Sequence, residues 1–189
     1  MSPVIDLIGS AKGFGWGALT AGSSFESIAT ITGSGTPNSI TFSSIPSTYK
    51  HLQVRFRTLG NSSGSDPYLT FNGITTATYD WHSIAGNGSA SSATGVSGDN
   101  GIRLMYGANT NNTYPMSAVI DIHDYTSTSK NKTIKTFAGQ DFNGTETGVV
   151  VLSSGLYRST SAITSISIEL IGGPLYTATS VFSLYGIKG

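Results

Sequence analysis

Short runs in which apolar and polar residues alternate one by one constrain the fold of this 189-residue chain more than any other feature. The clearest run is Leu52–Thr58, in which every second side chain is apolar: Leu52, Val54 and Phe56. Successive side chains of a β-strand point to opposite faces of a sheet, so this run predicts a strand buried on one side. No stretch combines a 3.6-residue period with capping residues, so we expect an all-β protein.

Further runs rich in β-branched and aromatic residues predict ten or eleven short strands separated by Gly, Pro and Asn turns. They lie at residues 28–32 and 40–42, Tyr68–Phe71, Tyr79–Ile84, Ile102–Tyr106, Met116–His123, Lys132–Gly139, Thr147–Ser153, Ile163–Ile171 and Ser180–Tyr185. This spacing favours a two-sheet β-sandwich of the jelly-roll type. The Ser- and Gly-rich Asn87–Gly101 and the Asn-rich Asn109–Tyr114 are expected to be exposed loops.

The first 24 residues differ in composition from the domain predicted over residues 25–189. Glycines are dense there and disfavour both helix and strand interiors. Between them stand large apolar side chains that water does not favour: Val4, Ile5, Leu7, Ile8, Phe14 and Trp16. One interpretation is an extended arm that docks on a neighbouring subunit and becomes ordered on binding. The alternative is a segment folded back over its own domain.

Charge and cysteine content exclude several function classes. Lys and Arg number ten, as do Asp and Glu, so the net charge is zero and only 11% of residues are charged. A nucleic-acid partner is not expected, because such binding depends on phosphate neutralisation. The chain has no apolar run long enough to span a membrane and no basic leader region, so neither a membrane partner nor a signal peptide is expected. With no cysteine, disulfides and thiolate chemistry are excluded.

The few candidate catalytic or metal-ligating groups are better explained as surface residues. Asp121 and His123 share one strand face, but a metal site needs three or four ligands. Asp80 and His82 likewise share a face, and His51 is expected to form a hydrogen bond near a turn. The only other close carboxylate pair, Asp141 and Glu146, flanks an Asn-Gly turn. We therefore expect no enzyme, no cofactor and no metal.

Aromatic residues of the predicted domain allow two interpretations. Many could pack across strands or anchor an interface, and some could form a platform on which a sugar stacks. The residues concerned are Tyr68, Tyr79, Trp81, Tyr106, Tyr114, Tyr125, Tyr157 and Tyr176.

Four stretches together resemble a family of small virion structural proteins of tailed bacteriophages. They are Ser24–Thr30, Ser39–Gln53 with its ITFSSIPSTYKHLQ block, Asp121–Lys130, and Phe182–Gly189, which reads FSLYGIKG. The resemblance spans nearly the whole chain. It implies a capsid or tail component assembled in the host cytoplasm, and it carries over no catalytic residue.

The leading hypothesis is a capsid decoration, or cement, protein that binds the major capsid protein and its own copies, with a homotrimer expected. The alternative is a tail-fibre, tail-tip or collar component, whose host glycan site would combine the 87–101 and 109–114 loops with nearby tyrosines. A hydrolase acting on host polysaccharide would need a facing carboxylate pair, for which the sequence offers no good candidate.

Overall fold

The computed structural model describes residues 24–62, 64–105, 113–143 and 148–189, and within them the regular structure consists of twelve β-strands. Eight strands form one sheet in the order β1-β12-β3-β8-β9-β10-β5-β6. Their bounds are β1 Phe25–Thr32, β12 Val181–Ile187, β3 His51–Thr58, β8 Met116–Ile122, β9 Lys132–Gln140, β10 Val149–Tyr157, β5 Tyr79–Gly86 and β6 Ser91–Asp99. The other sheet has the order β2-β11-β4-β7, with β2 Ser39–Phe42, β11 Ile166–Leu170, β4 Pro67–Phe71 and β7 Ile102–Arg103.

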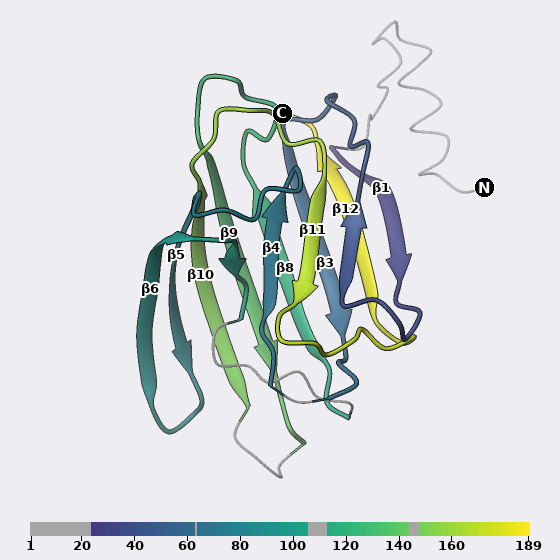
Figure 1. The fold of residues 1–189 in the computed structure, drawn as a ribbon, viewed down its shortest axis with the longest axis vertical. Helices are drawn as coiled ribbons and strands as arrows, with labels where there is room; N and C mark the ends of the chain where they lie inside the picture. The colour runs from purple at the N-terminus through teal and green to yellow at the C-terminus, as the bar shows by residue number, and fades with distance from the viewer. Residues whose placement is uncertain (1–23, 63, 106–112, 144–147) are drawn as a thin grey trace, which may run out of the picture.

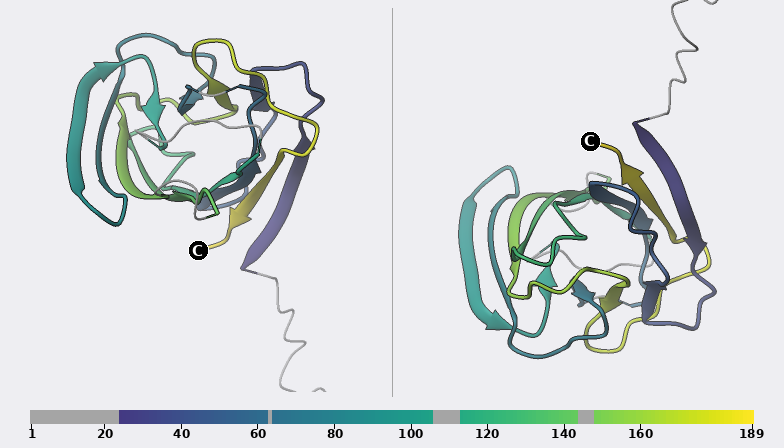
Figure 2. Two further views of the ribbon diagram at one scale, coloured as in Figure 1. Left: turned by 90° about the horizontal axis from the view of Figure 1, so that it is seen from below. Right: turned by 90° about the horizontal axis from the view of Figure 1, so that it is seen from above.

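The two sheets pack face to face, and every strand pair is antiparallel (Figure 1). Seen along the strands, the eight-stranded sheet curves around the smaller sheet, with β1 and β6 at its two opposite edges (Figure 2). The chain passes repeatedly from one sheet to the other, so neighbours in a sheet are often distant in sequence. The predicted two-sheet β-sandwich is confirmed.

Strict alternation places one hydrophobic core between the sheets. Leu52, Val54 and Phe56 of β3 are buried, whereas Arg55 and Arg57, which alternate with them, are exposed. The same period holds in β8, where Ile120 and Ile122 have no exposed surface. A single cluster of buried residues joins side chains of both sheets. Burial of one face of each strand is therefore what the alternating sequence encodes.

Three aromatic rings bind the sheets together beside β5. Phe71 of β4 lies 5.3 Å from Tyr157 of β10 and 6.2 Å from Tyr79 of β5, measured between ring centroids. Tyr79 and Tyr157 stack at 5.0 Å. The Tyr79 hydroxyl accepts the backbone N–H of Phe71 at 2.9 Å and donates to the carbonyl oxygen of Ile74 at 2.9 Å. One buried tyrosine thus satisfies polar backbone groups of β4 in the opposite sheet and of the turn that follows β4.

The prediction of a loop over Asn87–Gly101 is wrong for residues 91–99, although most of them are exposed as predicted. Residues Ser91–Asp99 form β6, a nine-residue edge strand that pairs with β5 along its length. Its composition is poor in β-branched residues and rich in Ser, Gly and Ala, which is why periodicity did not reveal it. Pairing with β5, whose Trp81 and Tyr79 are anchored in the core, supplies the order that the local sequence lacks.

Other strand bounds differ by a few residues. The predicted strand Ile102–Tyr106 shortens to the two residues of β7, and Ile163–Ile171 shortens to β11. β10 extends to Tyr157, four residues beyond the predicted end. Most of Asn109–Tyr114 and all of the predicted arm before Ser24 lie outside the described residues. In the part of the chain that the structure describes, no helix has the length and hydrophobicity needed to cross a bilayer.

Phe71→Ala is expected to lower the free energy of unfolding by about 3–5 kcal/mol, because it opens a cavity between the two sheets. The measurement is urea unfolding followed by tryptophan fluorescence. Ile74→Ala is the control, since that side chain is 37% exposed and its loss leaves the core filled. Equal losses in the two variants would show that the aromatic contact does not hold the sheets together.

Candidate functional site

The outer face of the eight-stranded sheet carries an exposed apolar strip. Strand register places Leu152 of β10 opposite both Phe137 of β9 and Ile84 of β5. Val150 stands two residues from Leu152 on the same face. We call Ile84, Phe137, Val150 and Leu152 the apolar strip; their exposed fractions are 58%, 61%, 48% and 51%. Four large apolar side chains that are neighbours in space, and this open to water, form a patch rather than scattered surface residues.

Apolar side chains continue the cross-strand line of Phe137, Leu152 and Ile84 onto the neighbouring strand at each end. Phe137 lies opposite the half-buried Val119 of β8, and Ile84 lies opposite the exposed Ala93 of β6. From the exposed fractions, the apolar area is on the order of 400 Å², which is within the range of patches that are often functional on monomers. The cross-strand partners of Val150 are both glycines, Gly139 of β9 and Gly86 of β5, which have no side chain. A partner could therefore approach the sheet closely there.

Two shallow hollows lie along this face. One, of about 580 Å³, is lined by strip residues Ile84 and Leu152 together with Lys135 and neighbouring small residues. The other, of about 410 Å³, lies between Phe137, Val150 and Arg55. Each hollow has an apolar floor and a basic side chain at its border. The arrangement suits a protein surface with apolar knobs and some acidic groups.

Polar residues of the same face are held by contacts with one another. Arg55 donates from Nε to Gln53 at 2.7 Å, and Gln53 donates to Asp121 at 2.7 Å. The Arg55 guanidinium also lies 5.0 Å from the ring centroid of Phe25 and 5.4 Å from that of Tyr185. These contacts fix the border of the apolar strip on the β3 side.

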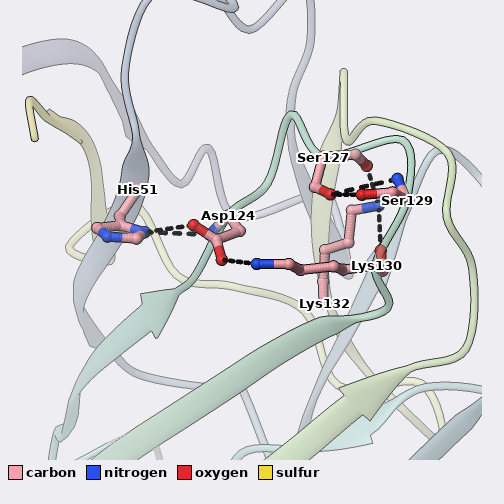
Figure 3. Close-up of polar contacts among 6 residues, drawn as sticks. All are labelled: His51, Asp124, Ser127, Ser129, Lys130 and Lys132. Carbon is pink, nitrogen blue, oxygen red and sulfur yellow. Dashed lines mark hydrogen bonds and ion pairs between the residues drawn. The ribbon is translucent and has the colours of Figure 1, made fainter.

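A second candidate surface is a polar hollow of about 810 Å³ at one end of the sandwich. Its lining includes Lys50, Asp124, Lys130 and Lys188. Figure 3 shows the polar contacts of Asp124, Ser127, Ser129 and Lys130 from this lining with one another and with the neighbouring His51 and Lys132. Lys130 lies 3.8 Å from Asp124, and both side chains are exposed to solvent. The charged side chains that line this hollow are three lysines and one aspartate. Lys130 pairs with Asp124, and Lys188 pairs with Glu26 outside the lining.

Below this hollow, Lys132 is a structural anchor. It has no exposed surface, and its Nζ donates to the carbonyl oxygens of Ser127 at 2.6 Å and Lys130 at 3.0 Å (Figure 3). It also donates to the carbonyl oxygen of Ser159 at 3.2 Å. Three acceptors match the three donors of an ammonium group. Burial lowers the pKa of Lys132. Its role is to shape the β8–β9 loop, not to meet a ligand.

The Asp121–His123 and Asp80–His82 pairs lie on or directly after strands β8 and β5 of the eight-stranded sheet. Asp121 and His123 lie on the outer side of β8 and its end, and Asp80 and His82 share the outer face of β5. His51 accepts the backbone N–H of Asp124 at 3.0 Å, which confirms a hydrogen bond next to a turn. Across the described ranges, no three His, Cys, Asp or Glu side chains are grouped to hold a metal. Asp141 is exposed, and Glu146 lies outside the described residues.

The aromatic residues considered for a sugar platform are mostly in the core. Six of them are buried: Tyr68, Tyr79, Trp81, Tyr125, Tyr157 and Tyr176. Tyr114 is half-buried against Phe142, and Tyr106 lies outside the described residues. A stacking platform needs ring faces open to solvent. The six buried aromatics therefore serve packing.

The arm residues predicted to dock on a partner, namely Val4, Ile5, Leu7, Ile8, Phe14 and Trp16, lie outside the described residues. The apolar strip was not predicted from the sequence. Its one local signal was Phe137, which alternates with buried residues and so belongs to the outer face of its strand.

No protein-family model matches the sequence, and no curated protein matches it. Among solved structures, the chain is similar to xylan beta-1,4-xylosidase from Bacillus halodurans C-125, with 9% sequence identity and a TM-score of 0.27. The similarity covers 80% of this chain and 33% of that protein, so the chain spans about a third of its length. A likeness this distant carries no argument about activity.

Lys132→Met is expected to lower the free energy of unfolding by at least about 2 kcal/mol, because it leaves buried carbonyl oxygens without donors. Lys130→Met is the matched control two residues away. Its exposed ion pair contributes at most about 1 kcal/mol. Urea unfolding measures both, and a loss in the control as large as in the Lys132 variant would contradict the anchoring role.

His51 should make the fold less stable as the pH falls. Burial lowers the pKa of His51, the nearby His123 and Lys50 act in the same direction, and Asp124 and Asp121 oppose them. The unfolded chain, with its ordinary pKa of about 6.5, then binds the proton more readily. Stability from His51 is thus complete above that pH and declines as the pH falls through it.

The measurement compares unfolding free energies at pH 7.5 and pH 5.0. His51→Gln keeps an acceptor for the Asp124 amide without titrating, so its decline should be smaller than that of the unaltered protein. Buried or paired carboxylates such as Glu26 and Asp99, whose pKa values are lowered, titrate below this window. Identical declines would overturn the assignment to His51.

Proposed function

We propose that this protein is a non-enzymatic structural subunit of a bacteriophage virion, a capsid decoration protein that binds the major capsid protein through the apolar strip. The observation that carries the proposal is the exposure of Phe137, Leu152, Ile84 and Val150 on one continuous surface. The resemblance of the sequence to small phage virion proteins supplies the assembly in which such a surface would be covered.

The energetics of the strip suit a repeated contact. Covering about 400 Å² of apolar surface corresponds to a gross gain of about 10 kcal/mol, from which the costs of association must be subtracted. The area of one strip is smaller than the roughly 800 Å² that each partner buries in a standard interface. Binding would therefore gain from several linked copies that engage the shell together. A homotrimer satisfies that condition.

Low charge supports the same function. Only 11% of the residues are charged, and the net charge is zero. Copies of such a protein repel one another little when they are crowded at high density on a shell. The basic residues that border the strip, Arg55 and Lys135, could contact acidic groups of the partner.

Phe137→Ser combined with Leu152→Ser is expected to reduce the number of copies bound per particle by about tenfold or more, a loss of about 1.4 kcal/mol or more. Quantitative mass spectrometry of purified particles measures copies against the major capsid protein. Val181→Ser is the matched control, because Val181 is 39% exposed on the same sheet face but lies beside β1, away from the strip. Equal binding by both variants would contradict the role of the strip.

The stoichiometry of the unaltered particle tests the location itself. A ratio to the major capsid protein near one, or a simple fraction of it, supports a decoration protein. A few copies per hundred would instead place the protein on the tail or collar, and absence from particles would overturn a virion function.

A further inference from the structure

Over most of its length, the edge strand β6 lacks the features by which sheet edges usually avoid further pairing. Such features are short length, charged side chains, proline and bulges. Among the edges that the structure describes, β7 has two residues and β2 has four. β1 has a bulge between Ser27 and Ala29, and its Glu26 pairs with Lys188. β6 has nine residues, its one charged side chain is the terminal Asp99, and its one irregularity lies at the Tyr79 end.

The outward edge of β6 presents backbone hydrogen-bonding groups. In antiparallel pairs, hydrogen-bonded and non-hydrogen-bonded positions alternate. The Asn87 N–H donates to the Ala90 carbonyl at 3.1 Å, so Asn87 and Ala90 are a hydrogen-bonded pair of the β5–β6 hairpin. By that alternation, Ser91, Ala93, Gly95 and Ser97 direct their N–H and C=O groups away from β5. No strand of the described chain pairs with β6 on that side.

β6 is held in position to receive a strand. Asp80 accepts the backbone N–H of Gly98 and the hydroxyl of Ser97, both at 2.8 Å. The indole N–H of Trp81 donates to Asp99 at 2.8 Å. These contacts fix the end of β6 nearest Asp99, and the hairpin fixes the other end. An added strand would therefore find an ordered edge, which reduces the entropy cost of pairing.

Both faces beside this edge are partly apolar. On the outer face, Ala93 lies opposite Ile84, so a new strand would extend the row of the apolar strip. On the inner face, Val96 is 42% exposed, although its partner Trp81 is only 1% exposed. The smaller sheet does not extend far enough to cover β6. A strand that is apolar on both faces would fit this position.

We propose that residues 4–8 of one copy pair with β6 of a second copy as an added strand. This segment reads Val-Ile-Asp-Leu-Ile, stands between Pro3 and Gly9, and combines high strand propensity with apolar side chains on both faces. Within residues 1–23 it is the one run of this kind. Main-chain hydrogen bonds would supply affinity, and the apolar side chains would supply selectivity.

A second copy is the better donor than the same chain. Residues 1–23 precede β1 in the sequence. β1 and β6 are at opposite edges of the eight-stranded sheet (Figure 2). Seven strand spacings separate these edges, about 34 Å. The 15 residues between Ile8 and Ser24 can reach that far when extended, but they would lie across strands without sheet partners. Donor and acceptor at opposite edges would instead link copies head to tail, and such a chain of copies forms a ring where the rotation between copies closes.

Disulfide trapping tests the pairing in the purified full-length protein, which contains no cysteine of its own. One variant carries Asp6→Cys, and a second carries Cys in place of Ser91, Ala93 or Ser97. Mixing the two under oxidation should give a covalent dimer for at least one of the three positions. Asp6→Cys mixed with Ser117→Cys, an exposed position on β8 of the same face, is the matched control and should not cross-link.

The cross-link also separates the two donors. If the mixed single variants do not cross-link, but a chain carrying both cysteines closes on itself, the segment docks on its own domain and the proposal is wrong. If neither cross-links at any of the three positions, the segment does not pair with β6 and the proposal is equally wrong.

A second test uses mass in solution by light scattering. Deletion of residues 2–9 should convert the oligomer to a monomer. Ala93→Pro should do the same, because proline removes an N–H on the free edge, a position where edge strands tolerate it. Ala93→Ser keeps that N–H and should remain oligomeric. Unchanged mass in both the deletion and the proline variant would overturn the proposal, even if particle binding through the strip is intact.

Discussion

The packing of a narrow sheet against a wide one determines which surfaces this protein leaves open. Four strands can cover only part of the inner face of eight, and the aromatic contact of Phe71 with Tyr79 and Tyr157 lies near the end of that cover. Beyond it, Val96 of β6 is exposed even though it points inward. The outer face of the wide sheet has no cover among the described residues. The open inner side of β6 follows from this difference in width, and the apolar strip follows from the uncovered outer face.

The fold class could be predicted because apolar and polar residues alternate one by one, a period that fits β-strands with one buried face. Leu52–Thr58 became β3 with the expected inward residues, and Met116–His123 became β8 with one residue less. The same rule was less informative in β9, where the buried position at the strand start is Lys132 and an exposed position is Phe137. An inward lysine is stable only because three carbonyl groups meet its ammonium group, and those carbonyls come from a loop and a distant turn.

The apolar strip could not be predicted in the same way, because it is a property of register between strands. Phe137, Leu152 and Ile84 come from three strands, and each is an ordinary residue in its own segment. In β10 the run Val149–Leu152 is apolar throughout, so the sequence does not show which of its residues face outward. β6 was missed for a related reason: Ser, Gly and Ala encode little strand preference, and its order comes from β5.

The two proposed contacts use different parts of the sheet, so they do not compete. Strand addition at β6 uses backbone groups in the plane of the sheet, whereas the apolar strip points away from that plane. A ring closed by edge pairing makes its copies equivalent, and each strip then stands at the same distance from the symmetry axis. One copy binding a shell would place its partners' strips near equivalent sites, which raises their effective concentration. Edge pairing would thus strengthen attachment by linking the strips of several copies.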